Sequence, residues 1–325
     1  MPTAKARSDG KLLMFGSLKG GAGKTTLSLL AVEALLAQRE ATRAEAPRSA
    51  GVILIDADVV GTEASDVVGT EYTPHKRSLA EIIGHVATDK SAYVWLQDEI
   101  RGLVDRGGGR YLIPSFGDML AEQRTVWREV LEHSELYIQR RMRDLVGACR
   151  AHHLDVVIDL PAFDVGFAAQ VRQGLAAEEP APAMFFVTDC DVRSVRATLT
   201  HRARSAPTSR IAINRVPDRD HQLESLAPHD SVFVPEVPEV LVATRANEAG
   251  GEGGTGNWEI PLAPLEDAPL HARLRDMLNL APNGSLLRHV LLGEAQTAPS
   301  KTVGSRSRRR GRGGRPPRSQ KGPTR

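Results

Sequence analysis

The chain has 325 residues, of which 41% are apolar and 25% charged, with a formal net charge of +2. This length suits one large domain with appendages, or two small domains. No apolar run approaches the ~20 residues of a membrane-spanning helix, and the polar start of the chain does not resemble a secretory signal. The two cysteines, Cys149 and Cys190, are too few for a disulfide framework. We therefore expect a cytoplasmic protein.

The small net charge hides an asymmetry. Ten of the 42 Lys and Arg residues lie in the segment 299–325, which has no Asp or Glu. This segment consists largely of Arg, Gly, Pro and Ser, so it cannot bury a core. We expect a flexible N-terminus at 1–10, a folded domain at 11–295 and a disordered basic tail at 296–325. The tail is the segment most suited to bind a polyanion such as DNA or RNA. The alternative is a solvated tail without a function.

Strand and helix patterns alternate along the chain. The pattern predicts an α/β fold in which a mostly parallel twisted sheet has helices on both faces. The first expected strand is at 12–15 and is followed by a helix at 24–39 and a polar loop at 40–50. Further strands are expected at 52–55, 111–113, 156–158, 184–188, 211–214 and 232–234. Further helices are expected at 79–86, 93–104, within 119–151, between the later strands, at 270–280 and at 285–292.

A phosphate-binding motif follows the first strand. Residues 19–26 read KGGAGKTT and lead directly into the first helix. Small residues let backbone N–H groups face a polyphosphate, Lys24 supplies a cation, and the Thr25 hydroxyl is placed to bind Mg²⁺. The positive end of the helix points at the same phosphates. The strict P-loop pattern has a glycine at the position of Leu18, and this chain instead has a second lysine, Lys19.

Carboxylates follow two strands of the expected sheet. The run 52–55 ends in Asp56 and Asp58, and the run 156–158 ends in Asp159. Ligands of open α/β sheets bind beyond the carboxyl ends of the strands. An Asp after an apolar strand is the Walker B arrangement, in which the carboxylate holds Mg²⁺ through water. We expect Mg²⁺ to be held by Thr25 and Asp159, with Asp56 in support. A structural alternative is that Asp58 only caps the following turn.

The lysine-first motif resembles the deviant Walker A motif of the ParA/MinD family of dimerising P-loop ATPases. The resemblance covers roughly residues 11–249, and it implies the SIMIBI type of P-loop NTPase fold. It implies that Asp58 organises the attacking water and that Lys19 reaches the nucleotide of a partner subunit. Asn214, at the end of the strand at 211–214, would read the adenine base, with Pro235 beside it. The residues expected to contact ATP are Gly20, Gly21, Ala22, Gly23, Lys24, Thr25, Thr26, Asn214 and Pro235.

The resemblance also implies a function. We expect an ATP-bridged homodimer that hydrolyses ATP slowly and positions a DNA-borne cargo, such as a plasmid or chromosome region, through non-specific DNA contact. A ParB-like partner would stimulate hydrolysis. Residues 59–62 read VVGT where many partition ATPases have Pro-Gln-Gly-Asn, so the first switch is unusual. One alternative is therefore a weakly hydrolysing nucleotide switch in conjugation or secretion. Another is a MinD-like ATPase that acts on membranes, although the short helix at 285–292 disfavours it.

Overall fold

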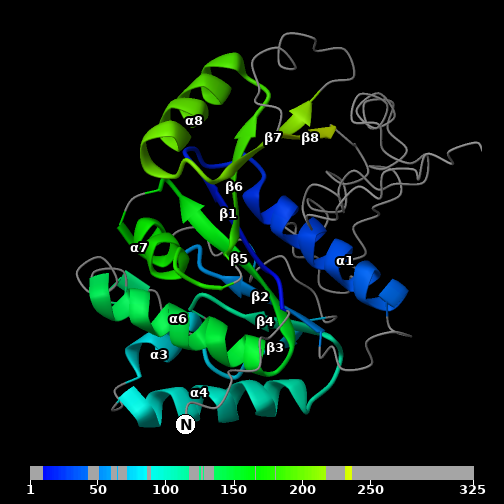
Figure 1. The fold of residues 1–325 in the computed structure, drawn as a ribbon, viewed down its shortest axis with the longest axis vertical. Helices are drawn as coiled ribbons and strands as arrows, with labels where there is room; N and C mark the ends of the chain where they lie inside the picture. Colours follow the sequence, from blue (N-terminus) through cyan, green and yellow to red (C-terminus); the bar gives the residue numbers. More distant parts are fainter. Residues whose placement is uncertain are drawn as a thin grey trace, which may run out of the picture. The chain divides into compact units, whose positions relative to one another are not determined.

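The computed structural model contains a parallel sheet with helices on both sides (Figure 1). It describes residues 10–42, 51–59, 64, 72–85, 89–116, 124–125, 127, 135–164, 166–179, 181–216 and 231–235. The strands of this part are β1 (Leu12–Ser17), β2 (Gly51–Asp56), β3 (Thr73–Pro74), β4 (Arg110–Ile113), β5 (Leu154–Ala162), β6 (Ala183–Asp189), β7 (Arg210–Val216) and β8 (Val232–Pro235). The helices are α1 (Lys24–Thr42), α3 (Leu79–Gly84), α4 (Asp89–Val104), α6 (Glu135–Ala151), α7 (Gly166–Leu175) and α8 (Val192–Ser205).

The strand order is β3-β4-β2-β5-β1-β6-β7-β8, and every neighbouring pair is parallel. Strand β1 lies between β5 and β6, near the centre of the sheet, so the loop that follows β1 is flanked by the ends of both strands. The residues of β1 and β2 are buried throughout, as expected for strands covered on both faces. The predicted α/β fold with a mostly parallel sheet is therefore confirmed.

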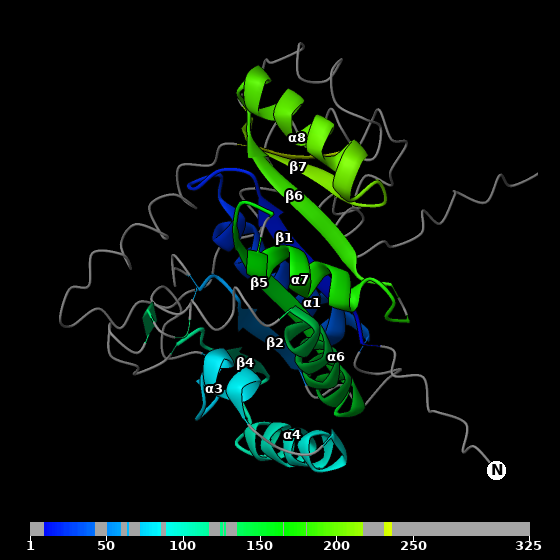
Figure 2. The same ribbon diagram turned by 90° about the vertical axis from the view of Figure 1, so that its left-hand side faces the viewer.

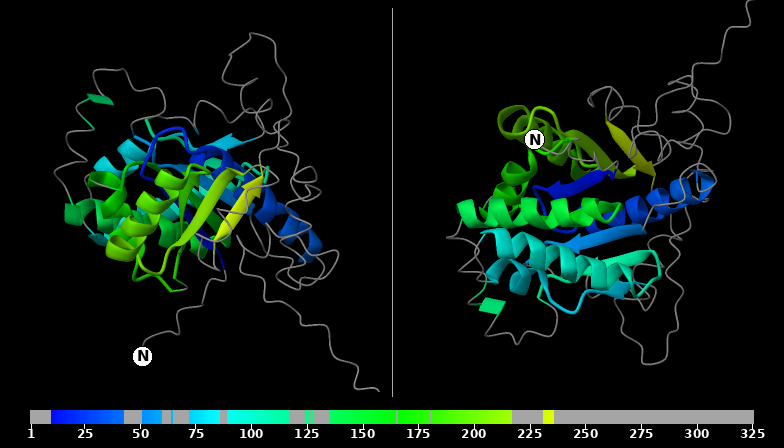
Figure 3. Two further views of the ribbon diagram at one scale, coloured as in Figure 1. Left: turned by 90° about the horizontal axis from the view of Figure 1, so that it is seen from above. Right: turned by 60° about the horizontal axis from the view of Figure 1, so that its bottom comes forward.

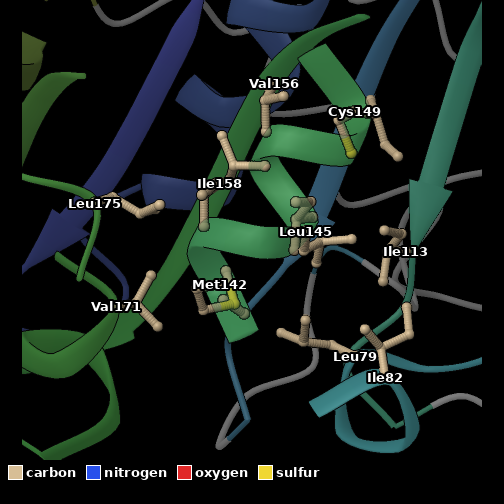
Figure 4. Packing of buried hydrophobic residues seen from close by; sticks show 14 of the residues in the cluster. Leu79, Ile82, Ile113, Met142, Leu145, Cys149, Val156, Ile158, Val171 and Leu175 are labelled. Carbon is tan, nitrogen blue, oxygen red and sulfur yellow. The ribbon is translucent and has the colours of Figure 1, made fainter. Parts of the chain in front are cut away.

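Each face of the sheet has its own apolar core. On one face, Leu27, Leu30 and Leu35 of α1 pack with Phe15 and Phe185 of β1 and β6, whose rings stack at 5.2 Å. On the opposite face, α3, α4, α6 and α7 pack against the sheet (Figure 3). Figure 4 shows the centre of this second core, where α6 lies over β5. The alternation of side chains along each strand divides them between the two cores.

The structure differs from the sequence prediction mainly at element ends. Helix α4 begins at Asp89, four residues before the predicted start, because its first turn is polar and lacks apolar periodicity. Helix α6 occupies the second half of the predicted helix within 119–151. The short edge strand β3 was not predicted, because two residues carry no alternating pattern. The helices predicted at 270–280 and 285–292, the N-terminus at 1–9 and the tail at 296–325 lie outside the described residues.

Candidate nucleotide-binding site

The segment 18–23 connects the end of β1 to the start of α1 at the carboxyl edge of the sheet. Gly21 and Gly23 have positive φ angles of 72° and 92°, a conformation that glycine adopts without steric cost. A Cβ at Gly20 or Gly21 would meet no atom within 4 Å, so the outer side of the loop is open to a ligand. Lys24, Thr25 and Thr26 form the first turn of α1, whose N–H groups lack helical partners.

Asn214 supports this loop from β7. Its side-chain amide donates a hydrogen bond of 3.1 Å to the carbonyl oxygen of Ala22, and the side chain is buried. A Cβ at Gly23 would lie 2.0 Å from the Asn214 amide nitrogen, so only glycine fits there. Pro235 ends β8, where it pairs in register with Val216. The base-reading roles of Asn214 and Pro235 stay predictions, and the structure adds a packing role for Asn214.

Three carboxylates lie beside the loop. Asp56 and Asp159 are register partners on adjacent strands, and neither is exposed to solvent. Asp58 follows the end of β2 and lies within 3.5 Å of the buried Lys24 ammonium. The Asp58 backbone N–H donates a hydrogen bond of 3.0 Å to Asp56 Oδ1, so the carboxylate that accepts this turn contact belongs to Asp56, and the role of the Asp58 side chain stays a prediction. Strand pairing therefore brings the predicted acids together around the phosphate-binding lysine.

Thr25 and Asp159 make direct contact. The Thr25 hydroxyl donates a hydrogen bond of 2.7 Å to Asp159 Oδ2. The other carboxylate oxygen of Asp159, Oδ1, is buried and has no hydrogen-bond partner among the described residues. The pKa of Asp159 is raised to about 8, mainly by burial, with a contribution from the charge of Asp56 and against the opposing charge of Lys24. An unsatisfied buried acceptor of this kind calls for a cation or a proton.

This pKa predicts how stability depends on pH without nucleotide and metal. The folded protein keeps the Asp159 proton up to about pH 8, while the unfolded chain loses it near pH 4. The folded state therefore binds more protons between these values, and the free energy of unfolding falls as pH rises, by up to ~1.4 kcal/mol per unit. We expect denaturant titrations in EDTA to show this loss.

The matched control is Asp159→Asn, which cannot ionise and has nearly the same shape. We expect it to be more stable than the wild type at pH 8 and to lack most of the decline. Identical pH dependence in the two proteins would show that Asp159 does not carry the buried proton.

Mg²⁺ fits the side chains at this position. The site offers a hydroxyl from Thr25, the unsatisfied oxygen of Asp159, and Asp56 on the adjacent strand. Mg²⁺ usually takes one or two carboxylates from the protein, with water and substrate phosphates as its remaining ligands. The described residues contain no group of three or more His, Cys, Asp or Glu that could hold a metal ion. A metal ion at this position would therefore need water and phosphate ligands as well.

Lys19 lies at the mouth of the loop, and its side chain is 59% exposed. Its ammonium forms an ion pair with Asp189, the last residue of β6. The hydrogen bond that Lys19 donates to Asp189 raises the pKa of Lys19, and the charge of Asp189 adds to this effect. Asp189 was not predicted as a site residue, although an acid that follows an apolar strand pattern was the signal that marked Asp56 and Asp159.

Two adjacent residues of the loop after β5, Phe163 and Asp164, are hydrogen-bonded to other elements. The Phe163 N–H donates to the Ser17 carbonyl at 2.7 Å. Asp164 is buried and accepts hydrogen bonds from Arg172 of α7, and its Oδ2 lies 2.9 Å from His201 Nε2 of α8. The Phe163 side chain is 58% exposed, and its backbone has a φ of 68°, a strained conformation for a bulky residue. No local sequence pattern indicates these contacts.

The sheet and the loop between β1 and α1 together define an α/β fold of the P-loop NTPase class. Among solved structures, the chain resembles a chain of the MinC:MinD cell division protein complex of Aquifex aeolicus, with 18% identity and a TM-score of 0.50. The match covers 88% of this chain and 97% of the other. The fold is therefore ParA/MinD-like, as the motif at 19–26 predicted.

Two other solved structures have similar coverage and lower TM-scores. A ParA family ATPase from Chlorobium tepidum TLS matches with 19% identity and a TM-score of 0.48, over 82% of this chain and 97% of the other. An ATP complex of a McdA variant from Cyanothece matches with 19% identity and a TM-score of 0.46, over 84% and 97%. No family model and no curated protein matches the chain. In the described part of the chain, no helix is long and apolar enough to cross a membrane.

Proposed function

We propose that the chain is an ATPase of the ParA type, which binds Mg·ATP, dimerises around it and positions a DNA-borne cargo through reversible, non-specific DNA contact. The observation that carries the proposal is the buried contact between Thr25 and Asp159, whose second carboxylate oxygen has no hydrogen-bond partner among the described residues. The nearby Lys24 ammonium supplies the cation that a triphosphate requires. The similarity to the chain of the MinC:MinD complex supports the fold on which the proposal rests.

Each side chain has a separate task in this proposal. Backbone N–H groups of 20–26 and the Lys24 ammonium bind the phosphates, and Asn214 and Pro235 lie beside the base. Thr25 and Asp159 would hold Mg²⁺, supported by Asp56, and the bound ion would neutralise phosphate charge. Asp58 orients the attacking water. Lys19 leaves Asp189 and reaches the partner's nucleotide, where a cation stabilises developing negative charge as an arginine finger does.

The partners follow from the same proposal. The protein acts in the cytoplasm as a homodimer bridged by ATP, and a ParB-like protein stimulates its slow hydrolysis. The basic tail at 296–325 contributes non-specific DNA affinity, because its ten cations release counterions from the phosphate backbone. A membrane partner is not expected.

The test measures phosphate release and oligomeric state with ATP, with and without DNA. We expect slow release that DNA or a partner changes, and a dimer that forms with ATP and not with ADP. Dimerisation without turnover under every condition would support the nucleotide switch instead. Pelleting with anionic vesicles in the presence of ATP, without DNA retention, would support a membrane-positioning ATPase. No ATP binding at all would refute the proposal.

A further inference from the structure

The outward face of α8 carries positive charge and no acidic residue. The helix has 14 residues and no Asp or Glu among them. Val195 and Thr198 are buried against the sheet, and Figure 2 shows α8 outside β6 and β7. The exposed residues of the helix are Arg193, Arg196, Ala197, Thr200, Ala203, Arg204 and Ser205.

The three exposed arginines lie on one side of the helix. Arg193 and Arg196 are one turn apart, and Arg204 is eleven residues beyond Arg193, which returns to the same side at 3.6 residues per turn. At 1.5 Å per residue, the row is ~16 Å long. The exposed residues between the arginines are only Ala and Thr, so the guanidinium groups are the outermost part of this face.

These guanidinium groups have no protein partners among the described residues. No hydrogen bond, ion pair or ring contact joins the side chains of Arg193, Arg196 or Arg204 to another group there, whereas Arg172 on the adjacent helix is paired with Asp164. The acid that precedes the helix, Asp191, caps it by accepting a 3.0 Å hydrogen bond from the Ser194 N–H. The row therefore has no internal role in the folded part of the chain that the structure describes.

The row also stands out against the rest of the protein. Ahead of residue 299, the chain has 40 Asp and Glu against 32 Lys and Arg. In a segment with more acidic than basic residues, a helix face with three arginines and no acid is not expected from composition alone. It concentrates positive charge where a negatively charged partner can make several contacts at once.

We propose that this face of α8, defined by Arg193, Arg196 and Arg204, binds the phosphate backbone of double-stranded DNA. The proposal rests on the function proposed above and adds a second DNA surface, separate from the tail. Guanidinium groups bind phosphate oxygens with paired hydrogen bonds, and a straight row of them fits a stiff polymer with repeated phosphates.

The chemistry of the face selects duplex DNA over other polyanions. Single strands are usually held by stacking on aromatic side chains, and α8 has none. Insertion into a membrane surface requires exposed large apolar residues, which are absent from the exposed positions of α8. The phosphates that border the wide major groove of B-DNA, ~12 Å across, are open to a protruding helix, whereas the major groove of double-stranded RNA is deep and narrow.

The experiment uses the full chain with three substitutions, Arg193→Gln, Arg196→Gln and Arg204→Gln. Glutamine keeps a similar helix propensity and replaces the charged guanidinium with a neutral amide. Binding to a fluorescent 30-bp duplex of arbitrary sequence is measured by anisotropy over a salt series. Each lost phosphate contact flattens the plot of log affinity against log salt by ~0.9. We expect the slope to become less steep by about 2 to 3.

The matched control removes the same charge from α4, the turn that follows it and α6, with Arg101→Gln, Arg106→Gln and Arg143→Gln, all at exposed positions. We expect this variant to keep the wild-type slope. An equal decrease of the salt slope in both variants would mean that DNA affinity depends only on net charge. An unchanged slope in the α8 variant would mean that the basic tail alone binds DNA. Either result would overturn the proposal, as would arginine-dependent binding to double-stranded RNA or phosphatidylserine vesicles without binding to DNA.

Nucleotide binding separates this proposal from the function on which it rests. The α8 variant is expected to bind a fluorescent ATP analogue as the wild type does, because none of the three arginines contacts the loop at 18–23. A wild-type protein that binds no analogue refutes the proposed function, whatever α8 does. An α8 variant with normal ATP binding and normal DNA binding refutes only the α8 proposal.

Discussion

Replacing Lys24 with alanine is expected to abolish ATP binding, with Kd raised at least ~100-fold. Lys24 is buried, only 4% exposed, and its ammonium lies beside Asp58. Without it, a triphosphate would meet Asp56, Asp58 and Asp159 with no buried cation from the loop to offset their charge. Calorimetric titration with a non-hydrolysable ATP analogue and Mg²⁺ measures the effect. The control is Lys76→Ala, which removes a lysine from an exposed position.

A fold defect must be distinguished from a binding defect in this variant. Removing one member of a buried ion pair leaves its partner uncompensated, which costs ~3–5 kcal/mol of stability in typical cases. We therefore expect Lys24→Ala to unfold more easily than the wild type. The double variant Lys24→Ala/Asp58→Ala removes both charges and should recover much of the stability without recovering ATP binding. Wild-type affinity in either variant would show that the phosphates bind elsewhere.

Replacing Lys19 with alanine is expected to have a different effect. ATP binding should change by a few-fold only, while hydrolysis should fall by ~10³-fold, the range seen when a transition-state cation is removed. The reason is that Lys19 lies at the exposed mouth of the loop and pairs with Asp189, away from the buried Lys24. Phosphate release at saturating ATP and analogue binding measure the two effects separately.

Mixing two inactive proteins tests whether Lys19 acts on the partner's nucleotide. Lys19→Ala keeps its own Asp58, and Asp58→Asn keeps its own Lys19. In a mixed dimer, one site then has an intact Asp58 and receives Lys19 from the other subunit. An equal mixture should recover roughly a quarter of wild-type turnover, because half of the dimers are mixed and one of their two sites is complete. No recovery, with mixed dimers detected, would mean that Lys19 acts only within its own chain.

The sequence predicted those features that depend on local pattern. Continuous apolar runs marked β2 and β5 as buried strands, and the acids that follow these runs could be placed near one edge of a parallel sheet, although β5 continues past Asp159 to Ala162. The structure adds that Asp56 and Asp159 are in register and that Thr25 touches Asp159. The proximity of these groups was predictable because strand order in such a sheet is constrained by its connections.

Contacts between distant segments were not predictable in this way. Lys19 and Asp189 are 170 residues apart, and Asp164 and His201 are 37 apart. Nothing in the local sequence of either partner indicates its contact, because these pairs depend on the packing of α7, α8 and β6 in three dimensions. The strained φ of Phe163 depends on the same packing, because the Phe163 N–H is bonded to Ser17 and the side chain of the next residue, Asp164, is bonded to α7 and α8.

The buried carboxylate of Asp164 has a mechanical consequence. It lies five residues beyond Asp159 and contacts both Arg172 and His201, so two helices are fastened to the segment next to the expected phosphates. A shift of that segment when the γ-phosphate arrives or leaves would pull on α7 and α8 together. ATP hydrolysis at the carboxyl edge of the sheet would then reorient the arginine row of α8. DNA binding and release by that row would follow the nucleotide cycle.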